Sequence, residues 1–297
     1  MYNGFTVTDN MIKDIESSGA DNKFWIAIDG VEYLVKDSSY NNRRKANSLY
    51  PFCEYAGSNF ILFSGLLPCQ KTYLGRYQGR PVVICEDLFP DKGFKPFQEL
   101  HQSSAGTDLG NKEYTYSDVL YILQKKSELN NSAFNNYKHL FWLMFMFDAI
   151  LGNRDRHSGN WGFVKRSGIT YIAPIFDNGN CLFPDVPLAK TYDKDFIKLR
   201  TYRRPPSQFK MWKPEYPDRP MRTNFWEILS DYTSEFLDEL MLVSTIDCDE
   251  LIESATVGVP EIIQNWFCLI VHFRFECLIR FRDFDEVWEE YFSDKHH

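Results

Sequence analysis

The sequence predicts an α+β protein with two lobes, a small β-rich lobe over residues 1–88 and a larger, mostly helical lobe over residues 89–297. The first ninety residues alternate apolar and polar positions between turn signals, which is typical of strands. After Glu86 the pattern changes to long apolar stretches at helical spacing. The chain also carries 25 Phe, 17 Tyr and 7 Trp, and this ring area requires a large core, which excludes intrinsic disorder.

The first lobe is expected to hold one helix among four strands. Asp29-Gly30 is a strong hairpin signal between two apolar runs, and residues 77–79 form a second turn. The expected elements are strands at 24–28 and 32–36, a helix at 43–63, and strands at 70–76 and 80–86.

The second lobe is expected to begin with a loop, because Pro90, Gly93 and Pro96 interrupt the stretch from 87 to 114. The next helix should be capped by Ser117 or Thr115. A later helix, apolar on nearly all sides, should lie at the centre of the core. The expected elements are helices at 117–126 and 131–151, strands at 162–164 and 170–175, and helices at 225–242, 261–274 and 277–291.

Composition excludes several classes of protein. The net charge of −8 argues against general nucleic-acid binding. No run of eighteen uncharged apolar residues predicts a membrane span, and the first residues lack a secretion signal. The 7 cysteines form no C-x-x-C pair and read as reduced, buried side chains. We therefore expect a cytoplasmic monomer, although delivery into a host stays open.

Two polar segments follow the most apolar helix and carry the chemistry. The first runs from Gly152 to Gly162, and the second, 174–179, comes after the next hairpin. That hairpin should bring Asp177 back to Asp155 and Asn160. An Asn and an Asp supply the oxygen ligands that Mg²⁺ prefers, which leaves another Asp to accept the proton of an attacking hydroxyl. The order D-x-x-x-x-N followed by D-N-G therefore indicates phosphoryl transfer.

The first lobe supplies the residues that would hold a nucleotide. Lys36 ends an alternating strand and can reach phosphates, and Glu54 on the following helix can pair with it. The small residues Ser17, Ser18 and Gly19 precede the first expected strand, where backbone N–H groups could bind phosphate.

These segments resemble the HipA-like serine/threonine kinases, which share their fold plan with phosphatidylinositol kinases. The resemblance rests on G-N-x-D-x-H-x-x-N-W-G at 152–162 and P-x-F-D-N-G at 174–179. Residues 32–88 resemble the small lobe of the CtkA-like branch, through Y-L-V-K at 33–36, E-Y-x-G-S at 54–58 and L-G-x-Y-x-G at 74–79. The fold implied is a two-lobed, protein-kinase-like fold, and the chain is expected to be a compact catalytic core.

The resemblance also implies roles. Asp155 would be the catalytic base, Asn160 and Asp177 the Mg²⁺ ligands, and Lys36 a contact to the phosphates of ATP. Adenine would bind the backbone at Glu86 to Leu88. A serine of the phosphate loop is autophosphorylated in some of these kinases, which makes Ser17 and Ser18 candidates. The substrate would be a protein serine or threonine, and an antitoxin is a partner of some family members.

Several residues keep two interpretations. His157 is expected either to take part in catalysis or to hold the loop by a hydrogen bond to Asp177 or to the loop backbone. Arg154 and Arg156 either offset acidic charge near the site or are solvated. Gly179 is expected to supply an unusual backbone angle.

Residues 201–222 form a basic, aromatic segment with five prolines. It is either an exposed irregular loop or a surface that grips an acidic substrate or nucleic acid. Three rival functions also stay open: a lipid or small-molecule kinase, an ATP-binding pseudokinase or interaction module, and a metal-dependent phosphatase or nuclease.

Overall fold

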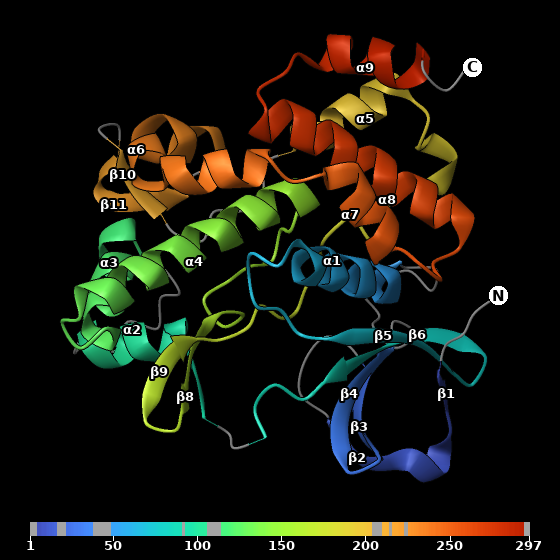
Figure 1. Cartoon of the computed structure of the whole chain (residues 1–297), viewed down its shortest axis with the longest axis horizontal. Helices are drawn as coiled ribbons and strands as arrows, with labels where there is room; N and C mark the ends of the chain where they lie inside the picture. Colours follow the sequence, from blue (N-terminus) through green and yellow to red (C-terminus); the bar gives the residue numbers. More distant parts are fainter. Residues whose placement is uncertain are drawn as a thin grey trace.

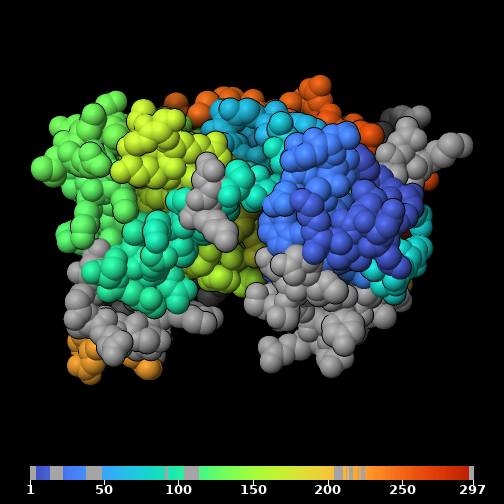
Figure 2. Space-filling view, turned by 90° about the horizontal axis from the view of Figure 1, so that it is seen from below, coloured from blue at the N-terminus to red at the C-terminus, as the bar shows by residue number. Residues whose placement is uncertain are grey.

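The computed structural model describes residues 5–16, 22–37, 49–90, 93–105, 114–203, 210–213, 216–222 and 225–293. A curled sheet forms one end of the molecule and a group of helices forms the rest, so the α+β, two-lobed prediction is confirmed (Figure 1). In the space-filling view the strands of the sheet occupy one end of the face (Figure 2). The other end holds α2 (Phe97–Ala105), α3 (Tyr116–Lys126) and the hairpin of β8 (Gly162–Arg166) and β9 (Ile169–Ile172).

The N-terminal sheet has six strands in the order β1-β5-β6-β4-β3-β2. Only the β1–β5 pair is parallel among these neighbours. The β3–β4 turn places both Asp29 and Gly30 at positive φ (51° and 81°), as a tight hairpin requires. The four expected strands are present, and β1 and β2 were not predicted. The bounds are β1 Phe5–Val7, β2 Ile12–Glu16, β3 Asn22–Ile28, β4 Val31–Asp37, β5 Thr72–Tyr77 and β6 Arg80–Glu86.

Helix α1 (Tyr50–Ser64) lies between this sheet and the C-terminal helices α7 and α8 (Figure 1). The expected start at residue 43 falls in 38–48, outside the described residues. Leu49 is not helical and Pro51 occupies the first turn, where its missing N–H does no harm. The helix ends at Gly65, which has a φ of 68°.

The prediction of a continuous loop over 87–114 is wrong. Strand β7 (Phe94–Pro96) pairs with β8, and helix α2 (Phe97–Ala105) follows it directly. The Phe97 ring stacks on Trp161 at 4.5 Å between ring centroids. A Cβ at Gly162 would overlap the backbone of Lys95 to Phe97. Tertiary packing therefore stabilises elements that Pro90, Gly93 and Pro96 obscured in the sequence.

Helix α4 (Asn131–Leu151) runs through the centre of the helical part, as predicted (Figure 1). Thr115 caps α3 in a reciprocal capping box with Asp118, so it is the cap rather than Ser117. The short helices α5 and α7 were not predicted. The remaining bounds are 3₁₀ turns Asp9–Met11 and Leu188–Lys190, α3 Tyr116–Lys126, β8 Gly162–Arg166, β9 Ile169–Ile172, α5 Lys194–Thr201, β10 Lys210–Lys213, β11 Tyr216–Arg222, α6 Phe225–Ser244, α7 Cys248–Ala255 and α8 Glu261–Arg274.

The expected single helix over 277–291 is also wrong. A π-helical turn, Phe275–Ile279, extends α8, and Phe281 then adopts a φ of 56°. Helix α9 (Phe284–Ser293) starts afresh after Asp283, whose carboxylate accepts from the N–H of Asp285 at 2.8 Å.

Residues 261–279 are long and apolar enough to cross a membrane by length and composition, with a mean hydropathy of 1.3 in the best window. Glu261 begins this segment, and Arg274 and Glu276 interrupt it, so it contains no run of eighteen uncharged apolar residues. In the structure 72% of that window is buried inside the protein, as in a core helix.

Two hydrophobic cores result, and they differ in size. The sheet encloses a small core of Val7, Phe24, Ile26, Val35, Val82 and Ile84. A much larger core joins the helices, and it includes Phe60 and other buried residues of α1. Helix α1 therefore lies within the first 88 residues yet packs with the helical part.

Candidate active site

The first polar segment leaves α4 through a left-handed turn at Gly152, with a φ of 66°. A Cβ at this position would approach the Phe183 ring to 3.0 Å, so glycine suits both the angle and the space. We call residues 152–161 the polar loop. Because it begins at the buried end of α4, its start is fixed by the core.

Arg156 holds the polar loop from the inside. Its side chain is buried, and its Nε lies 3.1 Å from Asp148 Oδ2 near the end of α4. The same guanidinium donates to the Asn160 carbonyl at 3.2 Å, the Phe176 carbonyl at 2.5 Å and Asn178 Oδ1 at 2.6 Å. Arg156 therefore joins α4, the polar loop and segment 174–179, and its interpretation as a solvated residue is wrong.

Asp155 lies on the outer side of this loop, whereas Asn160 is buried. The Asp155 side chain is exposed, and Asn180 Nδ2 donates to its Oδ2 at 2.8 Å. Asn153 Oδ1 accepts from the Asp155 N–H, and Asn160 Nδ2 donates to the Asp155 carbonyl. Since the amide nitrogen of Asn160 is engaged in this way, its Oδ1 is oriented as an acceptor.

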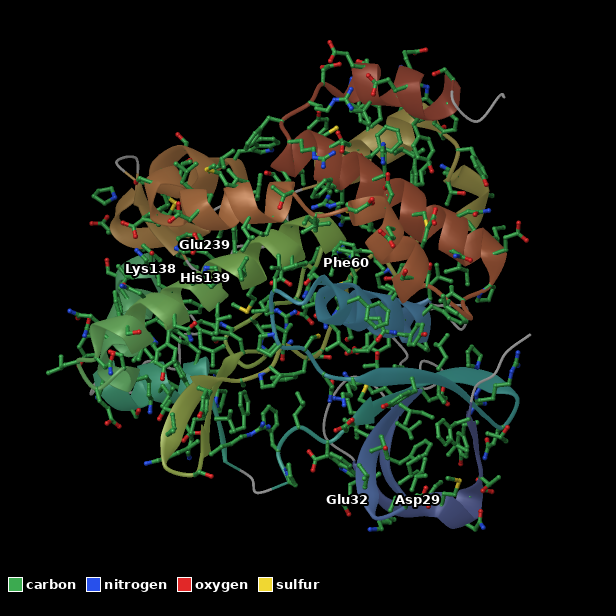
Figure 3. The ribbon with its side chains drawn as sticks, in the orientation of Figure 1. Asp29, Glu32, Phe60, Lys138, His139 and Glu239 are labelled. Atoms are coloured by element: carbon green, nitrogen blue, oxygen red, sulfur yellow. The ribbon has the colours of Figure 1, made fainter. Side chains whose placement is uncertain are left out.

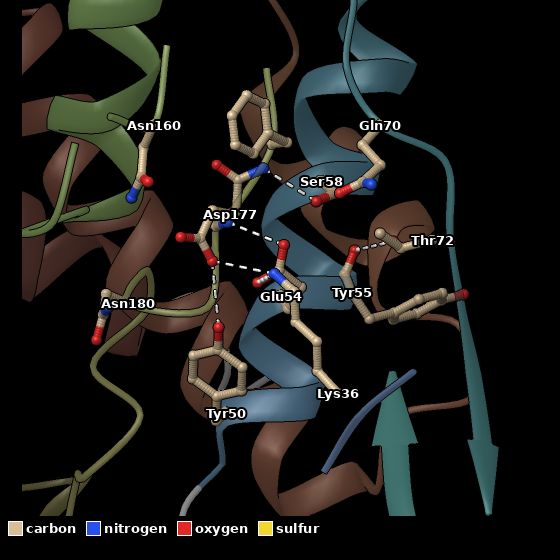
Figure 4. A network of polar contacts seen from close by, with 12 residues as sticks. Lys36, Tyr50, Glu54, Tyr55, Ser58, Gln70, Thr72, Asn160, Asp177 and Asn180 are labelled. Carbon is tan, nitrogen blue, oxygen red and sulfur yellow. Dashed lines mark hydrogen bonds and ion pairs between the residues drawn. The ribbon is translucent and has the colours of Figure 1, made fainter. Parts of the chain in front are cut away.

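The hairpin returns Asp177 to the polar loop, as the sequence predicted. After β9 the chain bonds to the segment that follows α1, because the Gln70 N–H donates to the Ile175 carbonyl and Ile175 donates to Pro68. Asp177 then takes a φ of 60°. Its carboxylate and Asn160 face each other in Figure 4, with Asn180 nearby.

Lys36 reaches Asp177 from strand β4. Its Nζ lies 3.1 Å from Glu54 Oε2 and 3.0 Å from Asp177 Oδ1. Tyr50 also donates to Asp177 Oδ1, at 3.3 Å (Figure 4). Lys36 and Glu54 are buried, whereas 31% of the Asp177 side chain is exposed. The expected Lys36–Glu54 pair is therefore present, and it lies against Asp177.

The charges in this group stabilise one another. Burial acts to raise the pKa of Asp177, but the Lys36 ammonium outweighs it and holds that pKa below its usual value. Burial likewise acts against the charged form of Lys36, while Asp177 and Glu54 raise its pKa well above the usual value. The lysine is therefore a fixed cation facing a fixed carboxylate.

Gly179 has a role different from the expected one. The positive φ in this segment belongs to Asp177, and Gly179 is needed because a Cβ there would overlap the Tyr50 ring. Next to it, Asn178 is buried, with its N–H bonded to Glu54 Oε1 and its amide to Ser58. These contacts fix segment 174–179 onto α1.

The residues expected to bind adenine lie in the connector after β6. The Glu86 N–H donates to Lys71, and its carbonyl accepts from Gln70 Nε2 at 2.9 Å. The Leu88 carbonyl accepts from Arg166. Among the described residues no hydrogen bond is recorded from the Leu88 N–H. The next ring, Phe89, stacks on Phe94 at 4.5 Å between centroids.

His157 contacts the polar loop rather than this group of charged side chains. His157 is exposed, and its Nδ1 accepts from the Gly159 N–H at 3.0 Å, so it contacts the loop backbone. Ser17, Ser18 and Gly19 lie outside the described residues.

The basic segment 201–222 is not an irregular loop where the structure describes it. Residues 210–213 and 216–222 form the β10–β11 hairpin. Tyr202 packs against the core through Trp226 and Phe284.

Comparison with known proteins adds to this geometry. No protein-family model matches the chain. The serine/threonine-protein kinase CtkA of Helicobacter pylori strain J99 is 31% identical over 221 residues. The crystal structure of a Helicobacter pylori proinflammatory kinase CtkA aligns with a TM-score of 0.75 at 26% identity, covering 93% of this chain and 96% of that chain.

The chain is therefore similar to the serine/threonine-protein kinase CtkA in sequence and in fold, and similar to HipA in fold. HipA itself, in a Shewanella oneidensis MR-1 complex of HipA, HipB and operator DNA, has a TM-score of 0.51 at 13% identity and covers 92% of this chain and 66% of that chain. This second likeness shows the shared fold. The match to the H. pylori J99 kinase spans 72% of this chain and 64% of that relative.

Sequence reasoning missed Tyr50 and Asn180 and left two interpretations open for Arg156. The burial of Arg156 and the contact of Tyr50 gave no signal, because buried and exposed side chains of one type look alike in a sequence. Asn180 follows the D-N-G segment directly, and its position there was the one available clue.

Proposed function

We propose that this protein is a HipA-like protein serine/threonine kinase that uses ATP and Mg²⁺. The observation that carries the proposal is the Lys36–Glu54 pair lying against Asp177, with Asn160 facing the same carboxylate. A phosphoryl-transfer site needs this set of groups, because catalysis there rests on positioning and on charge neutralisation.

The donor set fits Mg²⁺. Asn160 Oδ1 and Asp177 Oδ2 are hard oxygen atoms with no hydrogen bond recorded among the described residues. In the proposal these two side chains hold the ion, which would neutralise charge on the phosphates when bound. Lys36 would hold the same phosphates from the side of the sheet, and Glu54 would keep the lysine in place.

Asp155 is proposed as the base. Its exposed carboxylate is oriented by Asn180, and its backbone is fixed by Asn153 and Asn160. An acceptor hydroxyl would give its proton to this carboxylate as its oxygen bonds to the γ-phosphorus. The bond between the γ-phosphorus and the oxygen that bridges it to the β-phosphate would break, and ADP would leave. His157 supports the loop in this proposal, because it bonds the loop backbone.

The connector would bind adenine through its backbone. The Leu88 N–H is the donor we assign, since the N–H groups of Glu86 and Asp87 are bonded within the protein. Ser17, Ser18 and Gly19 remain the proposed phosphate loop and autophosphorylation sites. We propose that the lobes divide at 88, with a monomer as the working form and an antitoxin as a partner to be sought.

Transfer of labelled γ-phosphate to a protein extract tests the proposal. Asp155→Ala and Asp177→Ala should each lower transfer by about a thousandfold or more, since each removes a group of the reacting centre. Asp238→Ala, on an exposed face of α6, is the matched control and should keep full transfer. Circular dichroism should show that all three variants are folded.

Three results would contradict this assignment. Full activity of either site variant would remove its residue from the mechanism. Labelling of lipid vesicles or small alcohols in place of proteins would change the substrate class. Thermal stabilisation by ATP without any turnover would indicate a pseudokinase.

A further inference from the structure

Three arginines lie together beside the polar loop, and the described part of the chain gives them no acidic partner. Arg154 precedes Asp155, Arg200 lies in the last turn of α5, and Arg203 follows that helix. Among the described residues none of the three forms an ion pair with a carboxylate. Cationic side chains in proteins usually find such partners when they are partly buried.

Two of these arginines carry buried N–H donors for which the described residues supply no hydrogen-bond acceptor. The Nε atoms of Arg154 and Arg200 are buried, and neither has a hydrogen-bond partner. Leaving a buried donor unpaired costs about 1–3 kcal/mol, more when it is charged. Burial lowers the pKa of both side chains, and the neighbouring Arg203 lowers it further. An anion would relieve both costs.

The position of the cluster is fixed relative to Asp155. The Arg200 guanidinium lies 5.7 Å from the centre of the Phe183 ring, and that ring lies against Gly152 at the start of the polar loop. Behind it, the buried Arg274 donates to the carbonyls of Arg200, Thr201 and Arg203. Arg274 Nε also donates to Ala149 at the end of α4. The ends of α4 and α5 are therefore held together.

A surface cavity of about 510 Å³ opens next to the cluster. It is lined by Arg203, Tyr202, Leu199, Lys198 and Asp195. Lys198 is paired with Asp285, and Asp195 adds one acidic group to the rim. The exposed Leu199 and the ring of Tyr202 make the wall partly apolar. This lining suits a peptide better than a free ion.

The surrounding charges do not cancel the cluster. Asp155 and Asp185 are the acidic groups whose charge acts on Arg154, and both act less on its pKa than Arg203 does. Residues 197–213 contain six Lys and Arg and no Asp or Glu. No acidic residue of this stretch can therefore supply the missing partner.

We propose that Arg154, Arg200 and Arg203 bind an anionic side chain of the protein substrate, phosphorylated or acidic, a few residues from the acceptor serine or threonine. The inference rests on the proposed function, because it assigns a substrate class to that site. Arginine forms paired hydrogen bonds with phosphate and carboxylate groups, which gives the site its selectivity. The apolar wall would hold a neighbouring side chain of the same peptide.

Binding of labelled peptides to the full chain without ATP tests this inference separately from catalysis. The peptides share one sequence around a serine and differ at a single flanking position, which holds Gln, Glu or phosphoserine. This set of three is repeated for each flanking position on both sides of the serine. Fluorescence anisotropy should show that an anionic peptide binds at least tenfold more tightly than the Gln peptide. High salt should reduce this difference in affinity, because it screens the charges. The Glu and phosphoserine arms distinguish the two sources of charge.

Matched variants locate the effect. Arg203→Gln and Arg200→Gln should reduce the preference to about twofold, and Arg203→Glu should favour a Lys-flanked peptide. Arg76→Gln, on an exposed position of β5, is the control and should keep the preference. Arg203 is exposed, so its variants should fold even if Arg200→Gln is destabilised through lost contact with Phe183.

Two results would overturn the inference: equal binding of all three peptides by the unaltered chain, or a preference that survives in both arginine variants. Tighter binding of a single-stranded RNA oligonucleotide, lost in the same variants, would reassign the site to nucleic acid. Peptide selectivity without any phosphate transfer would instead leave the site in place and remove the proposed function.

Discussion

The sheet and the helical part differ in what holds them together. The sheet encloses six buried apolar side chains, whereas the helical part has a much larger, continuous core. Each delivers one cation to the site. Lys36 comes from the sheet and meets side chains alone, and Arg156 comes from the helical part and also meets backbone carbonyls.

This difference gives the two cations different roles: Arg156 holds the site in place, whereas Lys36 can change partners when a ligand binds. Arg156 has its guanidinium committed to Asp148, Asn178 and two carbonyls, so a ligand has little to gain there. Lys36 faces an Asp177 carboxylate that is partly open to solvent. We expect the helical part to supply most of the unfolding free energy and the sheet to open first.

The largest effect should come from Arg156→Met. It leaves the Asp148 carboxylate buried without its cation, which costs about 3–5 kcal/mol of unfolding free energy. Chemical denaturation measures this, with Arg219→Met on an exposed position of β11 as the control. A double variant, Asp148→Leu with Arg156→Met, should lose less than Arg156→Met alone. A loss below 1 kcal/mol in the single variant would show that the network is dispensable.

One variant in each hydrophobic core should show how the sheet and the helical part differ in stability. Phe60 lies on α1 (Figure 3). Phe60→Ala removes a ring whose centroid lies 5.9 Å from that of Phe147, and it should cost roughly 3 kcal/mol of global stability. Ile26→Ala in β3 should cost roughly 2 kcal/mol and act within the sheet. Hydrogen exchange by mass spectrometry separates them, because the first should raise exchange in α4 and the second in β3 to β6. Equal exchange changes throughout would mean that the molecule has one cooperative unit.

The smallest effect should come from Gly179→Ala, at roughly 1–3 kcal/mol, because the new methyl group meets the Tyr50 ring. Gly93→Ala is the control, since its Cβ would find the nearest atom at 3.4 Å. In a Tyr50→Leu background the cost of Gly179→Ala should shrink. An unchanged cost there would place the origin of the strain elsewhere than at Tyr50.

Local signals predicted the elements that local interactions decide. The Asp29-Gly30 turn, the Thr115 cap and the apolar run of α4 each act within a few residues of the chain, and each was readable. The polar loop was predicted as part of a functional site because a dense run of polar residues directly after an apolar helix is unusual in a purely structural segment.

The rest depended on distant partners. Helix α2 is held by the stacking of Phe97 on Trp161, sixty-four residues later in the sequence. The burial of Arg156 depends on segment 174–179 folding back, and the need for Gly179 depends on Tyr50 in the other lobe. A single sequence shows the residue types at such positions but not which of them meet.

The placement of α1 has a mechanical consequence. Because buried side chains of this helix belong to the large core while the strand of Lys36 contributes to the small one, the Lys36–Glu54 contact joins elements of two different hydrophobic cores. If the sheet turns relative to the helices, this 3.1 Å contact must stretch or break, whereas the strands and helices themselves need not deform. The distance between Lys36 and Glu54 therefore reports how the sheet and the helical part are oriented relative to each other.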